Sequence, residues 1–278
     1  DSEGYDLLGL MTGSEGLLGV ITEVTVKILK SPEVAKAALV GFTSIQDAGN
    51  CVTEIIAKGI IPAGMEIMDK ALTKATNDFS KAGYPVDAEA MMIIELDGTD
   101  SEVSELIKRV EEIATKNKCS SIKTSKSDEE RLKFWAGRKA AFPACAELAP
   151  DYMCMDGSIP RGKLAEVLKE IQKLSVKYGL PVANAFHAGD GNLHPLIMFN
   201  ANDPEQLRKT EEFGAEILKY CVKVGGALTG EHGVGIEKRE IMWEAFNDTD
   251  IQQQLKIKIA QNTKSLIKPS KRYPTLRK

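Results

Sequence analysis

The sequence has few histidines, no C-x-x-C cysteine pair, no long apolar run and no excess of positive charge, and each shortage excludes a class of protein. Its 36 basic and 40 acidic residues give a net charge of −4, so nucleic acid is not an expected partner. No stretch approaches the roughly 18 uninterrupted apolar residues of a membrane-spanning helix. The five cysteines are widely spaced and odd in number, which indicates a reduced, cytoplasmic chain without an iron–sulfur or zinc-knuckle site of its own.

What is present suits a folded protein. The 278 residues, 43% hydrophobic and 27% charged, are enough for one large domain or two smaller ones. The chain begins at Asp1 rather than Met, inside a patterned segment, so we expect a fragment or a processed product. We expect a domain boundary near Ser31 and Pro32, where one strand ends and a new unit begins.

Short apolar strands alternate with amphipathic helices from about residue 35 onward. The expected strands are residues 38–42, 91–96, 153–159, 182–187 and 195–199. Apolar residues three or four positions apart predict helices over residues 103–113, 164–174 and 213–224. This order predicts an α+β fold in which a mostly antiparallel sheet is covered by helices on one side.

Three glycines, Gly13, Gly16 and Gly19, lead into an alternating segment, residues 20–26, that we expect to be a strand. Such a turn lets backbone N–H groups approach a ligand closely, but a tight turn in an ordinary sheet needs the same residues. The spacing alone leaves both interpretations open.

The only three histidines lie in two glycine-flanked motifs, HAGDGNLH at residues 187–194 and GEHGVG at residues 230–235. The first motif lies between two apolar strands and contains the turn signal Asp190-Gly191. If these strands pair, His187 and His194 are cross-strand neighbours that can reach one ion. The second motif supplies Glu231 and a third imidazole. Two histidines and a glutamate suit zinc, iron or manganese and leave positions for a substrate.

Two further side chains need an interpretation. Arg138 lies among aromatic and small residues and is able to offer a bidentate fork to a substrate carboxylate, although a surface salt bridge fits the pattern equally well. Cys154 is interpreted as a small core residue rather than a nucleophile, because no basic side chain flanks it.

Four elements together carry a family resemblance: GSEGLLGVIT at residues 13–22, the W-x-x-R element ending at Arg138, and the two histidine motifs. They resemble the FAD-linked 2-hydroxy-acid dehydrogenases and oxidases of the vanillyl-alcohol-oxidase flavoprotein superfamily, in the branch of glycolate oxidase and D-lactate dehydrogenase. The resemblance covers essentially the whole chain. It implies that residues 1–30 are the C-terminal end of the FAD-binding domain. Residues 31–278 would then be the FAD-oxidase C-terminal domain, a ferredoxin-like domain that binds substrate and metal.

The resemblance also implies roles for individual residues. His187, His194 and Glu231 would be the metal ligands, His232 the catalytic base and Arg138 the ligand of the substrate carboxylate. The FAD contacts would come from one group of residues near the N-terminus, namely Gly13, Ser14, Glu15, Gly16, Gly19, Val20 and Ile21. Electrons would pass to a partner subunit, either an iron–sulfur protein or an electron-transfer flavoprotein, because this chain has no cysteine cluster.

The sequence departs from the family at several positions. Relatives that oxidise larger dicarboxylic hydroxy acids carry a lysine in place of Cys154 and an asparagine in place of Leu196, which favours a small monocarboxylate here. Near the C-terminus, Lys268 and Ser270 replace the asparagine and glycine of a closing element that contacts flavin.

The resulting hypothesis is a cytoplasmic, flavin-dependent enzyme, with peripheral membrane attachment through partner subunits left open, that oxidises D-lactate or glycolate to the 2-oxo acid. Two alternatives stay open from the sequence. One is a metal-dependent hydrolase that uses the same two histidines and glutamate to activate water. The other is a non-catalytic assembly subunit.

Overall fold

The computed structural model describes residues 3–262, 264, 266–267 and 273–274, and its backbone contacts divide the chain into two compact units. The sheet unit comprises residues 31–231, and the terminal unit comprises residues 1–30 together with residues 232–278. The sequence also predicts a boundary after residue 30 but keeps residues 31–278 as one domain. Their assignment to a flavin domain and a substrate domain stays a prediction.

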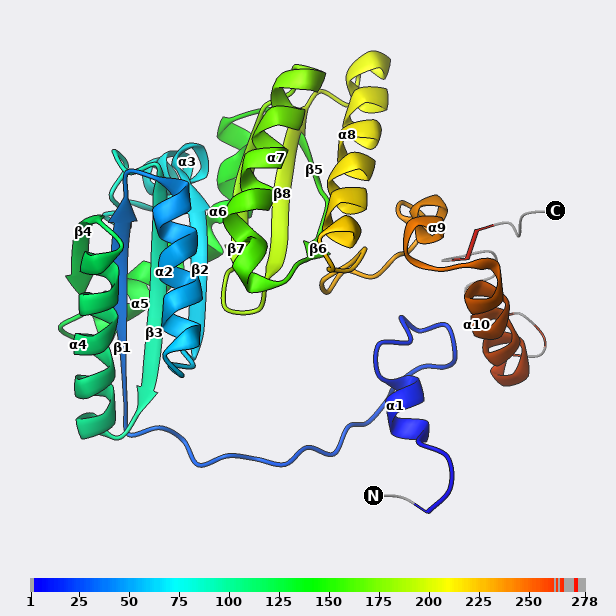
Figure 1. The fold of residues 1–278 in the computed structure, drawn as a ribbon, viewed down its shortest axis with the longest axis horizontal. Coiled ribbons are helices and arrows are strands. Elements are labelled where there is room, and N and C mark those ends of the chain that lie inside the picture. Colours follow the sequence, from blue (N-terminus) through cyan, green and yellow to red (C-terminus); the bar gives the residue numbers. More distant parts are fainter. Residues whose placement is uncertain (1–2, 263, 265, 268–272, 275–278) are drawn as a thin grey trace. The chain divides into compact units, whose positions relative to one another are not determined.

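The sheet unit is built on one antiparallel sheet (Figure 1). Its strands are β1 (Val34–Phe42), β2 (Gly64–Asp69), β3 (Ala90–Gly98), β4 (Cys119–Thr124), β5 (Asp151–Cys154), β6 (Gly157–Ser158), β7 (Val182–His187) and β8 (Asn192–Phe199). Their spatial order is β4-β1-β3-β2-β7-β8-β5, and β6 pairs with β8. The expected strand over residues 153–159 is thus two short strands.

The helices of the sheet unit are α2 (Ile45–Ala57), α3 (Lys70–Ser80), α4 (Asp100–Lys116), α5 (Asp128–Lys139), α6 (Ala141–Ala144), α7 (Leu164–Tyr178) and α8 (Pro204–Lys223). Between β1 and β4 the main elements follow the order β1-α2-β2-β3-α4-β4, with α3 inserted after β2. This order and the strand arrangement β4-β1-β3-β2 are those of a ferredoxin-like fold. The α+β prediction is confirmed.

Helices cover both faces of the sheet, whereas the sequence predicts them on one side only. The long helices α2, α4, α7 and α8 contact one another and one face (Figure 1). The shorter helices α3, α5 and α6 pack on the other face, against β1, β2 and β7. A buried set of hydrophobic residues lies on each side, which explains why the central strands are apolar on both faces.

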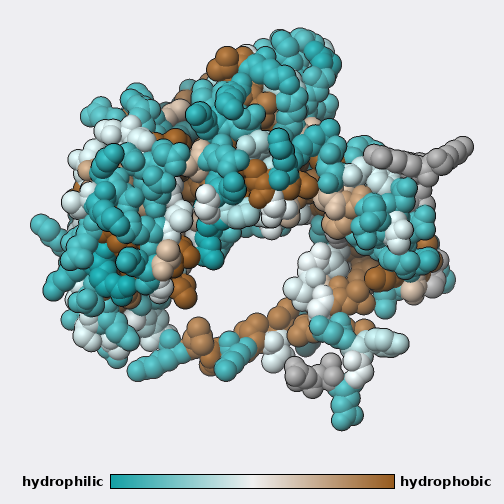
Figure 2. Space-filling model, in the orientation of Figure 1, coloured by the Kyte–Doolittle hydropathy of each residue, from teal (hydrophilic) through white to brown (hydrophobic). Residues whose placement is uncertain are grey.

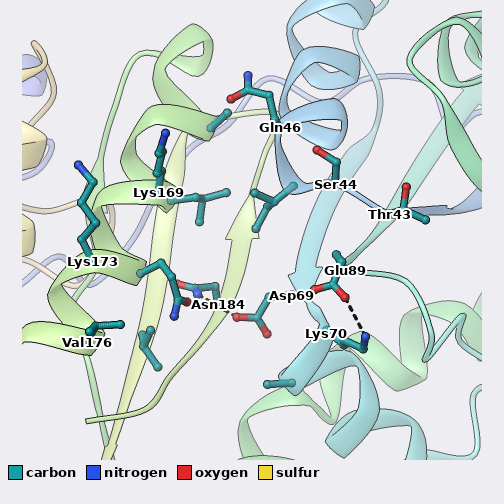
Figure 3. Close-up of a pocket in the computed structure, with 16 residues that line it drawn as sticks. Thr43, Ser44, Gln46, Asp69, Lys70, Glu89, Lys169, Lys173, Val176 and Asn184 are labelled. Carbon is teal, nitrogen blue, oxygen red and sulfur yellow. Dashed lines mark hydrogen bonds and ion pairs between the residues drawn. The ribbon is translucent and has the colours of Figure 1, made fainter. Parts of the chain in front are cut away.

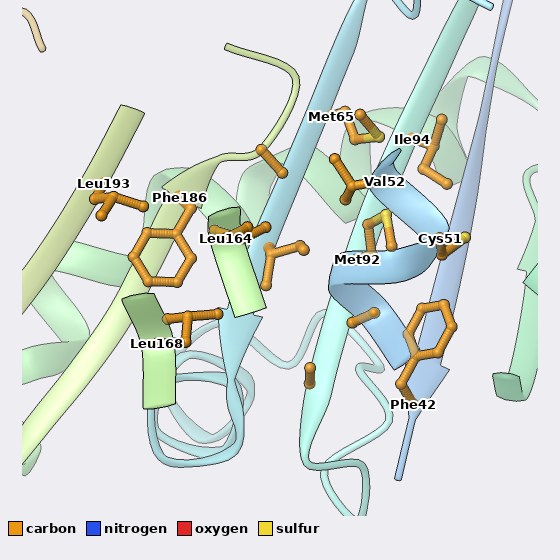
Figure 4. Packing of buried hydrophobic residues seen from close by; sticks show 14 of the residues in the cluster. Phe42, Cys51, Val52, Met65, Met92, Ile94, Leu164, Leu168, Phe186 and Leu193 are labelled. Atoms are coloured by element: carbon orange, nitrogen blue, oxygen red, sulfur yellow. The ribbon is translucent and has the colours of Figure 1, made fainter. Parts of the chain in front are cut away.

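The helix ends follow from local chemistry. Thr99 caps α4 and forms a capping box with Glu102, so the helix begins at Asp100, ahead of the apolar residues that predict it. Asp203 accepts the backbone N–H groups of Glu205 and Gln206 and is followed by Pro204 in the first turn of α8. The helices α2 and α7 bury Cys51, Val52, Leu164 and Leu168 in the hydrophobic core. Figure 4 shows these side chains against strand residues such as Phe186.

The terminal unit contains α1 (Leu7–Met11), α9 (Met242–Ala245) and α10 (Asp248–Gln261). Residues 20–26 do not form the expected strand. Their alternating apolar residues remain exposed, Val20 at 79% and Val24 at 72%, and hydrophobic atoms follow this segment in Figure 2. A strand needs a neighbour to pair its N–H and C=O groups, and no described strand pairs with these residues.

Two further predictions from the sequence concern the C-terminal element and membrane-spanning helices. Lys268 and Ser270 lie outside the described residues. Among the residues that are described, no helix combines the length and the apolar character needed to cross a bilayer.

Candidate functional site

The HAGDGNLH motif forms the hairpin between β7 and β8. Gly191 has a φ of +74° and a Cβ there would lie 2.2 Å from the Ile159 carbonyl oxygen, so the turn requires glycine. In the register, His187 is opposite Asn192 and His194 is opposite Ala185. The two histidines are therefore diagonal neighbours on one face, with ring centroids 5.0 Å apart and planes at 87°.

Glu231 completes a cluster with these two histidines. Its Oε1 lies 3.1 Å from His194 Nε2 and 3.8 Å from His187 Nε2. One ligand atom from each of the three residues lies within 4.8 Å of the others. His194 is only 2% exposed, whereas the side chain of Glu231 is 52% exposed, so one side of the cluster is buried and the other open.

Glu66 on β2 lies directly behind the cluster. Its Oε1 is 2.6 Å from His187 Nδ1, and this hydrogen bond raises the pKa of His187 above its ordinary value. With Nδ1 bound to a carboxylate, Nε2 is the nitrogen that faces Glu231. Carboxylates hold metal-binding histidines in this way, fixing the tautomer and raising the basicity of the free nitrogen.

Arg138 lies on α5 and pairs with the same carboxylate. Its Nε and Nη2 lie 3.1 and 3.0 Å from Glu66 Oε2, and the residue is only 8% exposed. The surface salt bridge left open by the sequence is therefore a buried one. Nη1 has no hydrogen-bond partner in the described part of the chain, so a bound carboxylate has a donor there. The role of Arg138 in substrate binding stays a prediction.

A second buried carboxylate, Asp156, holds the loop that carries Glu231. Its Oδ2 accepts the backbone N–H groups of Gly230 at 2.9 Å and Glu231 at 2.6 Å. The Thr229 hydroxyl donates to the same carboxylate at 3.2 Å. A Cβ on Gly230 would lie 1.9 Å from Asn192 Oδ1, so only glycine lets this loop approach β8 so closely.

The arrangement fits a divalent transition metal. Two imidazole nitrogens and one carboxylate oxygen form a donor set that binds zinc, iron or manganese. Glu66 orients one ligand and Asp156 fixes the backbone of another, as outer partners do in metal sites. The residues that would hold the ion are thus the three that the sequence predicts, His187, His194 and Glu231.

The remaining predicted site residues belong to the terminal unit. Glu15 accepts the backbone N–H of Val234 at 3.0 Å and therefore joins the glycine turn to the GEHGVG loop. Gly13 and Gly16 have φ values of +73° and +69°, and Gly13 and Ser14 line a small cavity of about 160 Å³. The flavin contacts of these residues and of Gly19, Val20 and Ile21 stay predictions. So does the role of His232, which is exposed.

Glu66 and Asp156 are absent from the sequence-based site. Both are single carboxylates in apolar stretches of the sequence, Gly64-Met65-Glu66-Ile67-Met68 in β2 and Met153-Cys154-Met155-Asp156 at the end of β5. A charge in such a segment must be paired when the strand is buried, and this signal is present in the sequence. The partners are not predictable from it, because they lie 121 and 75 residues away.

The family follows from similarity to known proteins. The model of the FAD linked oxidases, C-terminal domain, matches residues 31–271. Glycolate oxidase subunit GlcD of Escherichia coli K12 is 51% identical over 99% of this chain and 55% of that protein. D-lactate dehydrogenase [cytochrome] 1 of Saccharomyces cerevisiae is 32% identical over 99% of this chain and 48% of that protein. The chain spans about half the length of these relatives.

Solved structures share the fold at low identity. A 4-ethylphenol oxidase from Gulosibacter chungangensis matches with a TM-score of 0.68 and 13% identity, covering 90% of this chain and 56% of that one. An alkyldihydroxyacetonephosphate synthase matches with a TM-score of 0.64 and 17% identity, covering 97% and 51%. On the match over residues 31–271, the chain belongs to the family of FAD linked oxidases and contains their C-terminal domain.

Proposed function

We propose that the protein takes part in the flavin-dependent oxidation of a small D-2-hydroxy acid, D-lactate or glycolate, to the 2-oxo acid. The observation that carries this proposal is the cluster of His187, His194 and Glu231, backed by Glu66 and Arg138, in a member of the FAD linked oxidases. The names of the relatives, a glycolate oxidase subunit and a D-lactate dehydrogenase, give the substrate class.

Each residue has a role in this mechanism. Arg138 holds the substrate carboxylate through its remaining N–H groups, and His232 accepts the proton of the α-hydroxyl. His187, His194 and Glu231 would hold the divalent ion. The ion, when bound, supplies Lewis acidity that lowers the pKa of the hydroxyl. FAD, when bound, would supply the hydride acceptor, so the acid would lose the α-hydrogen as hydride as well as the hydroxyl proton and become the 2-oxo acid.

The electron-accepting partner and the cellular location of the protein are also proposals. The five cysteines form no disulfide, and among the described residues no candidate metal-binding group contains more than one cysteine. We propose that a separate subunit, an iron–sulfur protein or an electron-transfer flavoprotein, would receive the electrons. A cytoplasmic location stays a prediction.

The proposal predicts that D-lactate or glycolate bleaches the visible flavin absorbance of the intact protein under anaerobic conditions. Propionate, which has the carboxylate but no α-hydroxyl, is the matched control and should leave the spectrum unchanged. Flavin-loaded protein that neither acid bleaches would contradict the proposal. Hydrolytic activity without flavin would favour the metal-dependent hydrolase, and an intact complex without flavin on this subunit would favour the assembly role.

A second prediction concerns Glu66. We expect Glu66→Gln to weaken zinc binding by about 10–100-fold, because Gln cannot act as the anionic partner of His187. The variant should also lose about 3–5 kcal/mol of unfolding free energy, since buried Arg138 loses its counter-charge. Zinc affinity by competition with a chelator and thermal unfolding measure the two effects.

Glu95→Gln is the matched control. Glu95 pairs with another α5 arginine, Arg131, at 3.0 Å, also accepts the Trp135 indole N–H, and touches neither histidine. It should lower stability but leave zinc affinity unchanged. An equal loss of zinc affinity in both variants would contradict the assigned role of Glu66.

A further inference from the structure

A second cavity lies in the sheet unit, away from the histidines. It has a volume of about 910 Å³ and is lined by residues of β2, β7, α7 and the start of α2 (Figure 3). Asp69 follows Glu66 by three residues on β2, and Asn184 precedes His187 by three on β7. Successive side chains of a strand point to opposite faces, so Asp69 and Asn184 lie across the sheet from Glu66 and His187. The cavity is therefore separate from the candidate active site.

Asn184 brings an unpaired polar atom to this cavity. The residue is 6% exposed, and its Nδ2 donates to Asp69 Oδ2 at 2.8 Å. Asp69 also accepts the Leu72 N–H at 3.0 Å. Burial raises the pKa of Asp69 to about 6, so the carboxylate is ionised at neutral pH and only accepts, which fixes the orientation of the amide. Asn184 Oδ1 then has no hydrogen-bond partner in the part of the chain that the structure describes. A buried acceptor without a donor is costly, and a ligand hydroxyl would remove that cost.

One wall of the cavity, formed by α7, carries positive charge. Lys169 and Lys173 extend from α7, and Figure 3 shows Asn184 between these lysines and Asp69. Lys173 pairs with Glu170 at 2.7 Å, whereas Lys169 has no ion pair among the described residues. The third lysine, Lys70, is neutralised by Glu89 at 2.8 Å.

The start of α2 faces the lysines of α7 across the cavity (Figure 3). Ser44 caps this 13-residue helix, and Thr43, Ser44, Ile45 and Gln46 all line the cavity. The first N–H groups of a helix and its dipole attract anions, and phosphate above all. The cavity thus has two independent features. Lys169 and the start of α2 call for an anionic group, and the buried Asn184 Oδ1 calls for a hydrogen-bond donor on the same ligand.

We propose that this cavity binds a small phosphorylated polyol. Its phosphate lies between Lys169 and the start of α2, and one of its hydroxyl groups donates to Asn184 Oδ1. Lysines and helix N-termini suit a phosphate, while a planar carboxylate is matched better by arginine, which does not line the cavity. The volume also exceeds what a two- or three-carbon acid fills and lies in the range of sites for larger metabolites. This proposal does not depend on the proposed oxidation.

Glucose 6-phosphate, glucose and inorganic phosphate are suitable probes for calorimetric titration of the intact protein. We expect glucose 6-phosphate to bind at least about tenfold more tightly than either fragment, because only it reaches both groups. Lys169→Ala and Asn184→Ala should each weaken its binding by about tenfold or more. Lys177→Ala is the control on the same helix, because Lys177 pairs with Glu216 and does not line the cavity.

Each result of these titrations either supports or overturns the proposal. Asn184→Ala also removes the contact to Asp69, so the surface variant Lys169→Ala keeps the test valid if the buried variant fails to fold. Binding that neither variant weakens would overturn the proposal, as would the absence of binding by glucose 6-phosphate. Equal binding of inorganic phosphate and glucose 6-phosphate would overturn the assigned role of Asn184.

Discussion

Replacing His194 by alanine is expected to abolish zinc binding by the intact protein and, with it, oxidation of the hydroxy acid. His194 is the most deeply buried member of the cluster and lies 3.1 Å from Glu231. Without it, the proposed ligand set keeps two of its three members, the partly exposed Glu231 and His187. The loss of zinc affinity should exceed the about 10–100-fold loss that follows removal of a residue that only contacts a ligand, because His194 is itself a proposed ligand. Metal content after dialysis and zinc affinity are the measurements.

The control must separate loss of a ligand from loss of packing. The His194 ring packs against Phe142 with centroids 6.1 Å apart, and Phe142 carries no ligand atom. Phe142→Ala should therefore lower the melting temperature but retain one zinc per chain. If His194→Ala retains zinc with the affinity of the unmodified protein, the cluster is not a metal site.

Sequence patterns suffice for the strands whose signal is local and strong. The sequence predicts β7 with its observed bounds, because residues 182–187 are mostly apolar and a D-G turn follows at residues 190–191. It does not predict β2, because Met65, Glu66, Met68 and Asp69 surround a single β-branched residue, Ile67. Nor does it predict β4, because Cys119–Thr124 is a polar edge strand with little hydrophobic signal.

The same contrast applies to the candidate site. The two histidines come together through a local hairpin, so eight residues of sequence are enough to predict their proximity. Glu66 reaches them only because β2 lies beside β7 in the sheet, a pairing that joins segments 121 residues apart. Residues 20–26 give the opposite result, because an alternating pattern predicts a strand but supplies no neighbour to pair with it.

His232→Ala is expected to slow reduction of the flavin by the hydroxy acid by about 10²–10⁴-fold, the usual contribution of a general base. His232 directly follows Glu231 in the sequence. The substitution therefore removes a neighbour of one proposed ligand but keeps the whole proposed ligand set, His187, His194 and Glu231. Zinc content should therefore be unchanged, and the fold should be retained because the side chain is exposed. Anaerobic stopped-flow measurement of flavin absorbance gives the rate.

Two further readouts distinguish a base from a structural residue. The pH profile of the rate should differ between the unmodified protein and His232→Ala, because the variant lacks the proposed base. Added imidazole should restore part of the lost rate. Glu237→Ala, at an exposed position five residues further along the same segment, is the control and should leave both rate and pH profile unchanged. Unchanged flavin reduction in His232→Ala would exclude this histidine as the base, and the proton would then have to pass to a different group.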